Sequence, residues 1–324
     1  MKKRLFTIIF SFCLLVTDAQ SDSLAYKTDN KPSNHKKLFI AGGSAVYAAF
    51  ATGLYFSWYN QYDQTRFHFF NDWHEWEQMD KAGHLFSSYF QSDLIFNTAI
   101  RAGYSSDASL ALGAFSSLLF QSTIEVMDGF SSGWGFSVFD FSSNLVGTSI
   151  FAIQEKLWEE QRVKFKVSYW PVNHNDDIFY SENGLLSTSN KQRADALFGF
   201  HSLERLLKDY NGQTVWLSAN INSFFKQSVL PDWINIAFGY SSHNMYGGFI
   251  NSWGANDELF IVDSNKYPRH RQYILALDYD LSKVKTSNVF FKTLFDVLNI
   301  FKWPSPAIEY TSNGKMNFHL VFLN

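Results

Sequence analysis

The sequence predicts an α+β protein, in which an N-terminal antiparallel bundle of about four largely apolar helices precedes an antiparallel β-rich half with short amphipathic helices. Two observations predict this class. Apolar residues recur at helical spacing through residues 38–160, and from residue 161 onward they alternate with a period of two, as in strands. We therefore expect a signal peptide at 1–20, a flexible exported segment at 21–37, a helical membrane-associated domain at 38–160 and an antiparallel β-rich domain at 161–324.

The first element is a predicted signal peptide. Three basic residues at positions 2–4 precede the apolar run Leu5–Val16, and small or polar residues follow it at 17–20. This run is too short to cross roughly 30 Å of hydrocarbon, so we expect cleavage and export. The only cysteine, Cys13, follows Phe10-Ser11-Phe12, which lacks the small residues that precede a lipidated cysteine. We therefore expect neither a lipid anchor nor a disulfide in the exported chain.

Four helices are predicted next, at Leu38–Tyr59, Asp80–Ala102, Asp107–Met127 and Phe139–Glu155. Asp80 and Asp107 are the predicted N-caps of the second and third helices, and Gly103 is a predicted stop. The first and third helices are the most apolar, whereas the other two carry amide and charged side chains. Two alternatives remain open. Either the helices cross a bilayer, or they form a bundle that packs on the second half or rests at a membrane surface.

The second half contains segments in which apolar and polar residues alternate, as expected for strands with one apolar face. The predicted strands are Val163–Trp170, Val215–Ile221, Ile234–Tyr240, Tyr273–Leu281 and Met316–Leu323, and the predicted short helices are His201–Tyr210 and Asn288–Phe301. The connections at 173–177, 181–192 and 241–269 are long and polar. Because a closed transmembrane barrel needs at least about eight strands, we favour an antiparallel sheet packed against the helices, with a barrel or half-barrel facing lipid as the alternative.

The composition restricts the class of partner. The chain has 324 residues, of which 46% are hydrophobic and 19% aromatic, with 34 Phe, 16 Tyr and 10 Trp. Aromatic residues at this level suit membrane interfaces and lipid-facing sheets. The formal net charge of -3 is not that of a nucleic-acid-binding protein. We expect membrane lipid or another envelope protein as partner, and no cofactor.

Polar residues inside the apolar helical half form the candidate site. These are Asp80, Lys81, His84, Glu125, Asp128, Asp140 and Asn144. Ionisable groups in such helices are costly to bury and usually mark partners or function. The spacing of Glu77, Asp80 and His84 predicts one helical face that could hold a divalent cation or share a proton. No metal is assigned, because Asp80 also suits an N-cap, Lys81 also suits pairing with Glu125 or Asp128, and His84 also suits a hydrogen-bonded core position.

These motifs carry a resemblance. The segments Met79–His84, Ser122–Phe130 and Trp134–Ser137, with Asp140-x-x-x-Asn144-x-x-Gly147, resemble the YfiM-like family of predicted periplasmic proteins of unknown function. Segments 204–214 and 233–240 are similar to longer members of that family from Bacteroidetes-type bacteria. The helical half is more remotely similar to VanZ-like membrane proteins. The resemblance implies an envelope compartment and no particular reaction.

Two functions follow as alternatives. The favoured one is a non-enzymatic envelope protein with a structural or a lipid- or protein-binding role, and it predicts that the polar residues pair with one another without an open cleft. The other is a membrane-embedded enzyme, or a protein that binds a lipid head group or a metal, and it predicts a pocket shared by His84 and at least two carboxylates. The sequence lacks the motifs of common hydrolases, P-loop proteins and dinucleotide-binding proteins, so we lean against an enzyme.

Overall fold

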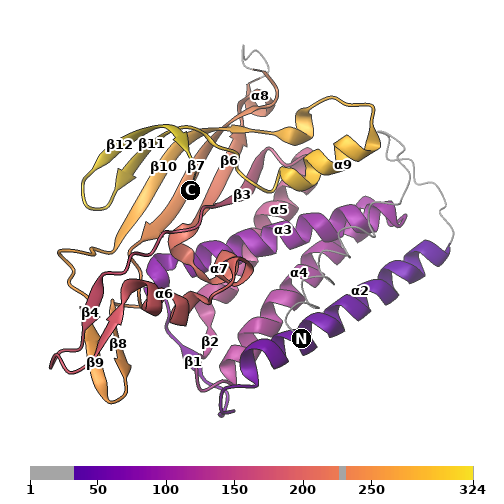
Figure 1. Ribbon diagram of the computed structural model, residues 1–324. Helices are drawn as coiled ribbons and strands as arrows, with labels where there is room; N and C mark the ends of the chain where they lie inside the picture. Colours follow the sequence, from indigo (N-terminus) through magenta and orange to yellow (C-terminus); the bar gives the residue numbers. More distant parts are fainter. Residues whose placement is uncertain (1–32, 226–230, 324) are drawn as a thin grey trace. The chain divides into compact units, whose positions relative to one another are not determined.

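The computed structural model describes residues 33–225 and 231–323 (Figure 1). The predicted signal peptide lies outside the described residues, as does most of the exported segment. The chain divides into two compact units. The helical unit contains the residues up to Asp72, His84–Gln161 and Thr286–Thr293, and the sheet unit contains Trp73–Gly83, Arg162–Lys285 and the residues from Leu294.

The helical unit is built from long helices near the positions that the sequence predicts. They are α2 (Ser33–Leu54), α3 (Met79–Arg101), α4 (Ser106–Gly129) and α5 (Val138–Trp158), and a π-helical turn at Tyr55–Tyr59 extends α2. Two short strands, β1 (Phe69–Phe70) and β2 (Phe136–Ser137), pair in parallel. The helical first half is thus confirmed, while the antiparallel order of the bundle stays a prediction.

Both predicted N-caps are wrong. Helix α3 begins at Met79, so Asp80 is already inside its first turn. The N-cap of α4 is Ser105, whose hydroxyl accepts a hydrogen bond from the Ala108 backbone at 3.3 Å. Serine caps as well as aspartate does and comes earlier in the chain, which leaves Asp107 in the first turn. The predicted stop is confirmed, because Gly103 follows α3 with φ of 92°.

Small residues allow the helices of this unit to approach closely. A Cβ on Gly113 of α4 would lie 2.7 Å from the Ser92 carbonyl oxygen on α3. Helix α2 contacts α4 through a 2.8 Å hydrogen bond between the hydroxyls of Tyr47 and Thr123. Packing of this kind, through small residues and hydroxyls, is common between helices in membranes.

Two helices are long and apolar enough to cross a membrane by length and composition. They span Asn34–Tyr59, which includes α2 and the turn after it, and Ser106–Gly129, which is α4. These are the two helices that the sequence marks as most apolar. Signal sequences and the core helices of soluble proteins share this length and composition.

The sheet unit contains a six-stranded antiparallel sheet in the order β12-β11-β10-β7-β6-β3. The strands are β3 (Val163–Tyr169), β6 (Gln213–Asn220), β7 (Ile234–His243), β10 (His270–Tyr279), β11 (Ser305–Thr311) and β12 (Met316–Phe322). Five of these correspond to predicted strands. The predicted antiparallel sheet is therefore confirmed, with β12 and β3 at its edges.

Smaller elements surround the sheet. They are the hairpins β4 (Ile178–Tyr180) with β5 (Ser187–Ser189) and β8 (Ser252–Ala255) with β9 (Glu258–Ile261), the helices α6 (Asn190–Phe198), α7 (Ser202–Lys208), α8 (Ile221–Phe224) and α9 (Val289–Leu298), and 3-10 turns at Glu75–Gln78, Tyr210–Gly212 and Leu281–Lys283. Helices α7 and α9 lie within the two short helices that the sequence predicts. The hairpins and α6 occupy segments that the sequence predicts as polar connections or leaves unassigned.

The sheet curves strongly. Trp216 belongs to β6 and Phe322 to β12, with three strands between them in the sheet, yet their ring centroids lie 5.8 Å apart. These two rings, together with Ile274 and three alanines, form the buried apolar centre of the concave face. We call this concave side the inner face of the sheet and the opposite side its outer face.

Candidate functional site

His84, near the start of α3, contacts polar groups on two other helices. Its Nδ1 atom lies 3.2 Å from Oδ1 of Asn144 on α5, and its Nε2 atom lies 3.7 Å from Oε1 of Glu125 on α4. Since an amide oxygen only accepts hydrogen bonds, the neutral ring that makes the first contact is protonated at Nδ1. The lone pair of Nε2 then faces the carboxylate.

The N-terminus of α5 orders three buried carboxylates around Ser137. The Ser137 hydroxyl donates to Oδ1 of Asp72 at 2.6 Å and accepts from the Asp140 backbone at 3.0 Å, which caps the helix. The Ser137 backbone donates to Oε2 of Glu125 at 3.3 Å. Asp72, Glu125 and Asp140 are all buried. The first turn of a helix favours negative charge, so this arrangement lowers the cost of burying these groups.

Close contact between α3 and α5 positions His84 beside Asp140. A Cβ on Gly147 of α5 would lie 2.3 Å from the Leu85 carbonyl oxygen and 2.2 Å from the Ser88 hydroxyl, both on α3. Only glycine fits where two helix backbones approach this closely. Asp140, Asn144 and Gly147 are spaced so that they lie on one face of α5. This face therefore contains a carboxylate, an amide and the close contact with α3.

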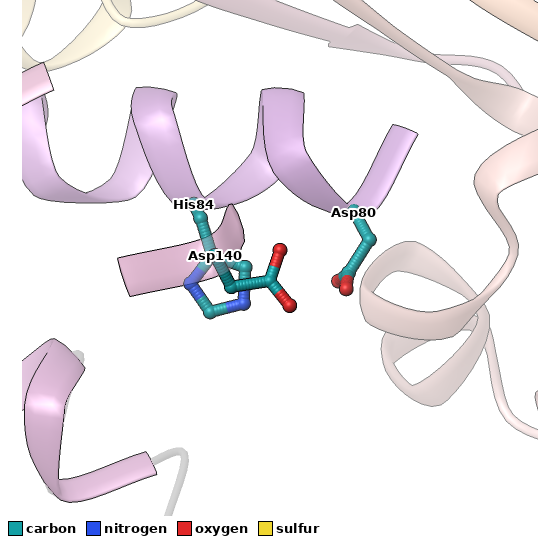
Figure 2. A group of neighbouring side chains, drawn as sticks. All are labelled: Asp80, His84 and Asp140. Atoms are coloured by element: carbon teal, nitrogen blue, oxygen red, sulfur yellow. The ribbon is translucent and has the colours of Figure 1, made fainter. Parts of the chain in front are cut away.

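Asp80, His84 and Asp140 form a group in which one ligand-capable atom from each residue lies within 4.8 Å of the others. Asp80 and His84 are four residues apart on one continuous helix, so α3 itself fixes their relative positions. Figure 2 shows both side chains projecting from the same side of α3, with Asp140 beside them. Imidazole nitrogen with carboxylate oxygens is a donor set that divalent transition cations accept.

Lys81, Asp128 and Glu77 lie outside this group of three residues. Nζ of Lys81 is 3.5 Å from Oδ2 of Asp80. Asp128, at the end of α4, accepts a 2.6 Å hydrogen bond from the Tyr59 hydroxyl. Glu77 does not share the helical face of Asp80, because it precedes α3 with φ of 50° and pairs with Arg271 at 2.7 Å. The prediction that Glu77, Asp80 and His84 share one helical face is therefore wrong for Glu77. Only Asp80 and His84 share that face.

Sequence reasoning missed Asp72 and Ser137. Asp72 lies in the aromatic segment before α3, where an acidic residue is expected to be solvated. Ser137 carries a detectable signal, because Ser137-Val138-Phe139-Asp140 is a serine followed three residues later by an acid, a common helix start. That signal places the N-cap of α5 at Ser137, so the helix begins at Val138, one residue before the predicted helix.

Two surface hollows in the described residues do not contain the predicted site residues. One is lined by Gly254–Leu259 and the other by Pro231–Trp233 with Lys283–Lys285. The polar cluster is largely buried, with His84 14% and Glu125 1% exposed. Whether these residues only pair with one another or share a substrate pocket stays a prediction.

The outer face of the sheet is a second candidate surface. The strands β6, β7, β10, β11 and β12 expose large apolar side chains on this face, namely Leu217, Ile236, Phe238, Tyr273, Leu275, Leu277, Ile308, Tyr310, Met316, Phe318 and Leu320. Cross-strand pairing aligns them, since Leu275 lies opposite both Phe238 and Ile308, and Ile308 lies opposite Phe318. A contiguous exposed apolar surface of this kind marks an interaction site.

Aromatic side chains border this apolar surface. Tyr240, Tyr273 and Tyr310 lie side by side on β7, β10 and β11 at one end. At the other end the rings of Trp233 and Tyr279 are 6.0 Å apart. Aromatic rows at both edges of an apolar band are typical of surfaces that meet a membrane interface.

The inner face is polar on both sides of its apolar centre. Lys166 and Asp278, both fully buried, form a 2.7 Å ion pair, and the Ser218 hydroxyl also donates to Asp278 at 2.7 Å. Burial lowers the pKa of Lys166, although Asp278 opposes this shift. Elsewhere on this face Glu309 accepts hydrogen bonds from Gln272 and His319. A water-exposed antiparallel sheet usually has the opposite pattern, with its apolar side inside.

The comparisons with known proteins agree with the compartment that the sequence predicts. Residues 68–156 match the family described as "Predicted periplasmic lipoprotein (DUF2279)", and this range contains all seven candidate site residues. No curated protein and no solved structure matches the chain. The match begins at residue 68, so it does not include the segment around Cys13. The chain is an exported, envelope-associated protein.

Proposed function

We propose that this chain is a non-enzymatic envelope protein that associates with membrane lipid through the outer face of its sheet. One observation carries the proposal: the sheet is apolar outside and partly polar inside, which is the inverse of a water-exposed sheet. Inverted polarity of this kind is characteristic of sheets whose outer face contacts hydrocarbon. The aromatic borders support lipid rather than a protein partner, because they resemble the rings that lie at head-group level.

The height of the apolar band indicates partial insertion. From Tyr273 to Tyr279 the strand β10 rises about 20 Å. The hydrocarbon core of a bilayer is roughly 30 Å thick, and strand tilt shortens the band further. The outer face therefore suits contact with one leaflet better than a crossing of both.

The burial of most of the polar cluster supports a role without catalysis. His84 contacts Asn144 and Glu125, Asp128 contacts Tyr59, and both Glu125 and Asn144 are buried. An enzyme or a head-group binder at this cluster would need an opening that a ligand could enter. The YfiM-like and VanZ-like resemblances belong to this proposal as well, since both point to a membrane-associated envelope protein.

We predict that Leu275→Lys weakens the association of the full exported chain with phosphatidylcholine vesicles at least tenfold. A lysine on a lipid-facing strand costs about 2–4 kcal/mol near the bilayer centre and less toward the interface. Other parts of the chain that contact the same bilayer, such as α2, add their own contributions to the free energy of association with the vesicle. Because these contributions are additive, the lysine substitution lowers the partition constant even if α2 also inserts. The measurement is the partition constant from vesicle flotation.

Leu185→Lys is the matched control, because Leu185 is 77% exposed in the β4–β5 connection, outside the outer face. This variant is expected to bind vesicles as the unaltered chain does. Equal partition constants for the unaltered chain and both variants would refute lipid contact by the outer face. In that case a protein surface would be the partner to seek.

A further inference from the structure

We propose that His84, Asp80 and Asp140 bind a structural divalent cation of the zinc class, which links the start of α3 to the start of α5. This inference is independent of lipid contact by the sheet. The three residues offer one nitrogen and two carboxylate oxygens within 4.8 Å of one another. Ligand atoms around zinc, at bond lengths of about 2.0–2.2 Å, lie roughly 3.0–3.5 Å apart, so side-chain shifts of about 1 Å close the site.

The contacts of His84 match those of a metal-bound histidine. Its Nδ1 faces the Asn144 amide oxygen at 3.2 Å, so Nε2 is the ring nitrogen that faces a carboxylate, that of Glu125. Metal-bound histidines almost always donate their second nitrogen to an oxygen in this way. The 3.7 Å separation between Nε2 and Oε1 of Glu125 is too long for a hydrogen bond and close to the spacing of two ligand atoms on one metal ion.

The charges at the site also favour a cation. Asp80, Glu125 and Asp140 are three carboxylates, the last two almost fully buried, and the ammonium group of Lys81 lies 3.5 Å from Asp80. Burying several carboxylates together is costly unless protons or cations neutralise them. A divalent cation neutralises two negative charges at once.

A buried amide gives a further, independent indication. Asn144 is fully buried, and its Nδ2 atom has no hydrogen-bond partner among the described residues. Such an amide costs about 1–3 kcal/mol unless something accepts its hydrogens. A water molecule in the coordination shell of a cation would accept one of them.

The cation belongs to the zinc class because of the donor set and the closed site. Imidazole nitrogen disfavours Mg²⁺ and Ca²⁺, which prefer oxygen ligands only. The burial of Asp140 and the 14% exposure of His84 fit a structural ion rather than a catalytic one. The ion would stabilise the contact that Gly147 permits between α3 and α5.

The test is equilibrium dialysis of the full exported chain against Zn²⁺, with Mg²⁺ in a parallel sample. We expect one Zn²⁺ per chain, no comparable binding of Mg²⁺, and a rise in Tm of roughly 5 °C at a Zn²⁺ concentration a hundredfold above Kd. His84→Ala and Asp140→Asn should each weaken Zn²⁺ binding at least tenfold. Co²⁺ in place of Zn²⁺ should give visible absorption that both variants lose.

His201→Ala and Asp176→Asn are the matched controls, because both side chains are exposed in the sheet unit. They should bind Zn²⁺ as the unaltered chain does. Circular dichroism separates loss of binding from loss of folding, and Asp140→Asn keeps the size of the side chain. The proposal is overturned if the unaltered chain binds no Zn²⁺, or if a folded His84→Ala variant binds it equally well.

Discussion

Replacing Lys166 by methionine is expected to lower the free energy of unfolding by about 3–5 kcal/mol. Lys166 is fully buried, and its Nζ atom contacts Asp278 at 2.7 Å, the Tyr279 carbonyl oxygen at 2.9 Å and the Asn299 amide oxygen at 3.0 Å. The methionine variant leaves the Asp278 carboxylate buried without its cation. Denaturant unfolding followed by circular dichroism measures the loss.

An exposed ion pair provides the control for this variant. Lys156 and Asp107 are 2.6 Å apart, but both side chains are largely exposed. Lys156→Met should therefore cause little measurable change. A double variant, Lys166→Met with Asp278→Leu, should recover part of the loss because neither charge then remains buried. If Lys166→Met were as stable as Lys156→Met, the polar inner face described above would be wrong.

Gly147→Ala is expected to destabilise the helical unit by about 3 kcal/mol. The new Cβ would lie 2.3 Å from the Leu85 carbonyl oxygen, and a backbone atom cannot rotate away as a side chain can. The helices α3 and α5 would have to separate, which would also move His84 from Asp140. Thermal unfolding measures the change, and Zn²⁺ binding should fall with it.

Gly43→Ala tests whether the effect comes from the contact or from the loss of a glycine. Gly43 lies inside α2, and a Cβ there would meet nothing within 4 Å. Alanine is the better helix former by up to about 1 kcal/mol, so this variant should be as stable as the unaltered chain or more so. Equal destabilisation by both changes would contradict the proposed close contact of α3 and α5.

Periodicity predicted most of the fold. The helical spacing located α2 to α5 to within a few residues, except that α2 begins before the predicted helix, and the period of two located five of the six strands of the main sheet. Strand β11 was missed because Pro304 and Pro306 indicate a break. The structure places Pro306 at a bulge between β11 and β12, where proline is tolerated. The short hairpins were missed because their strands have only three or four residues, too few to show a period.

The candidate site was predicted in part. Helical spacing predicted that Asp80 and His84 share one face, and the structure places them together with Asp140, while His84 also contacts Glu125 and Asn144. That these residues form a functional site stays a prediction. Asp72 was missed because its burial depends on a contact with Ser137, which is 65 positions away. Which face of the sheet is buried also cannot be predicted from alternation alone, because both faces of the β10 segment contain aliphatic side chains.

The most direct test of the account is the environment of Leu275 in a bilayer. With Cys13 replaced by serine, a single cysteine introduced at position 275 or at position 185 can carry an environment-sensitive fluorophore. Lipid contact predicts that acyl-chain spin labels quench the probe at position 275 and that aqueous iodide quenches the probe at position 185. If iodide quenched both probes equally in the presence of vesicles, the outer face would be exposed to water and the proposed function would be wrong.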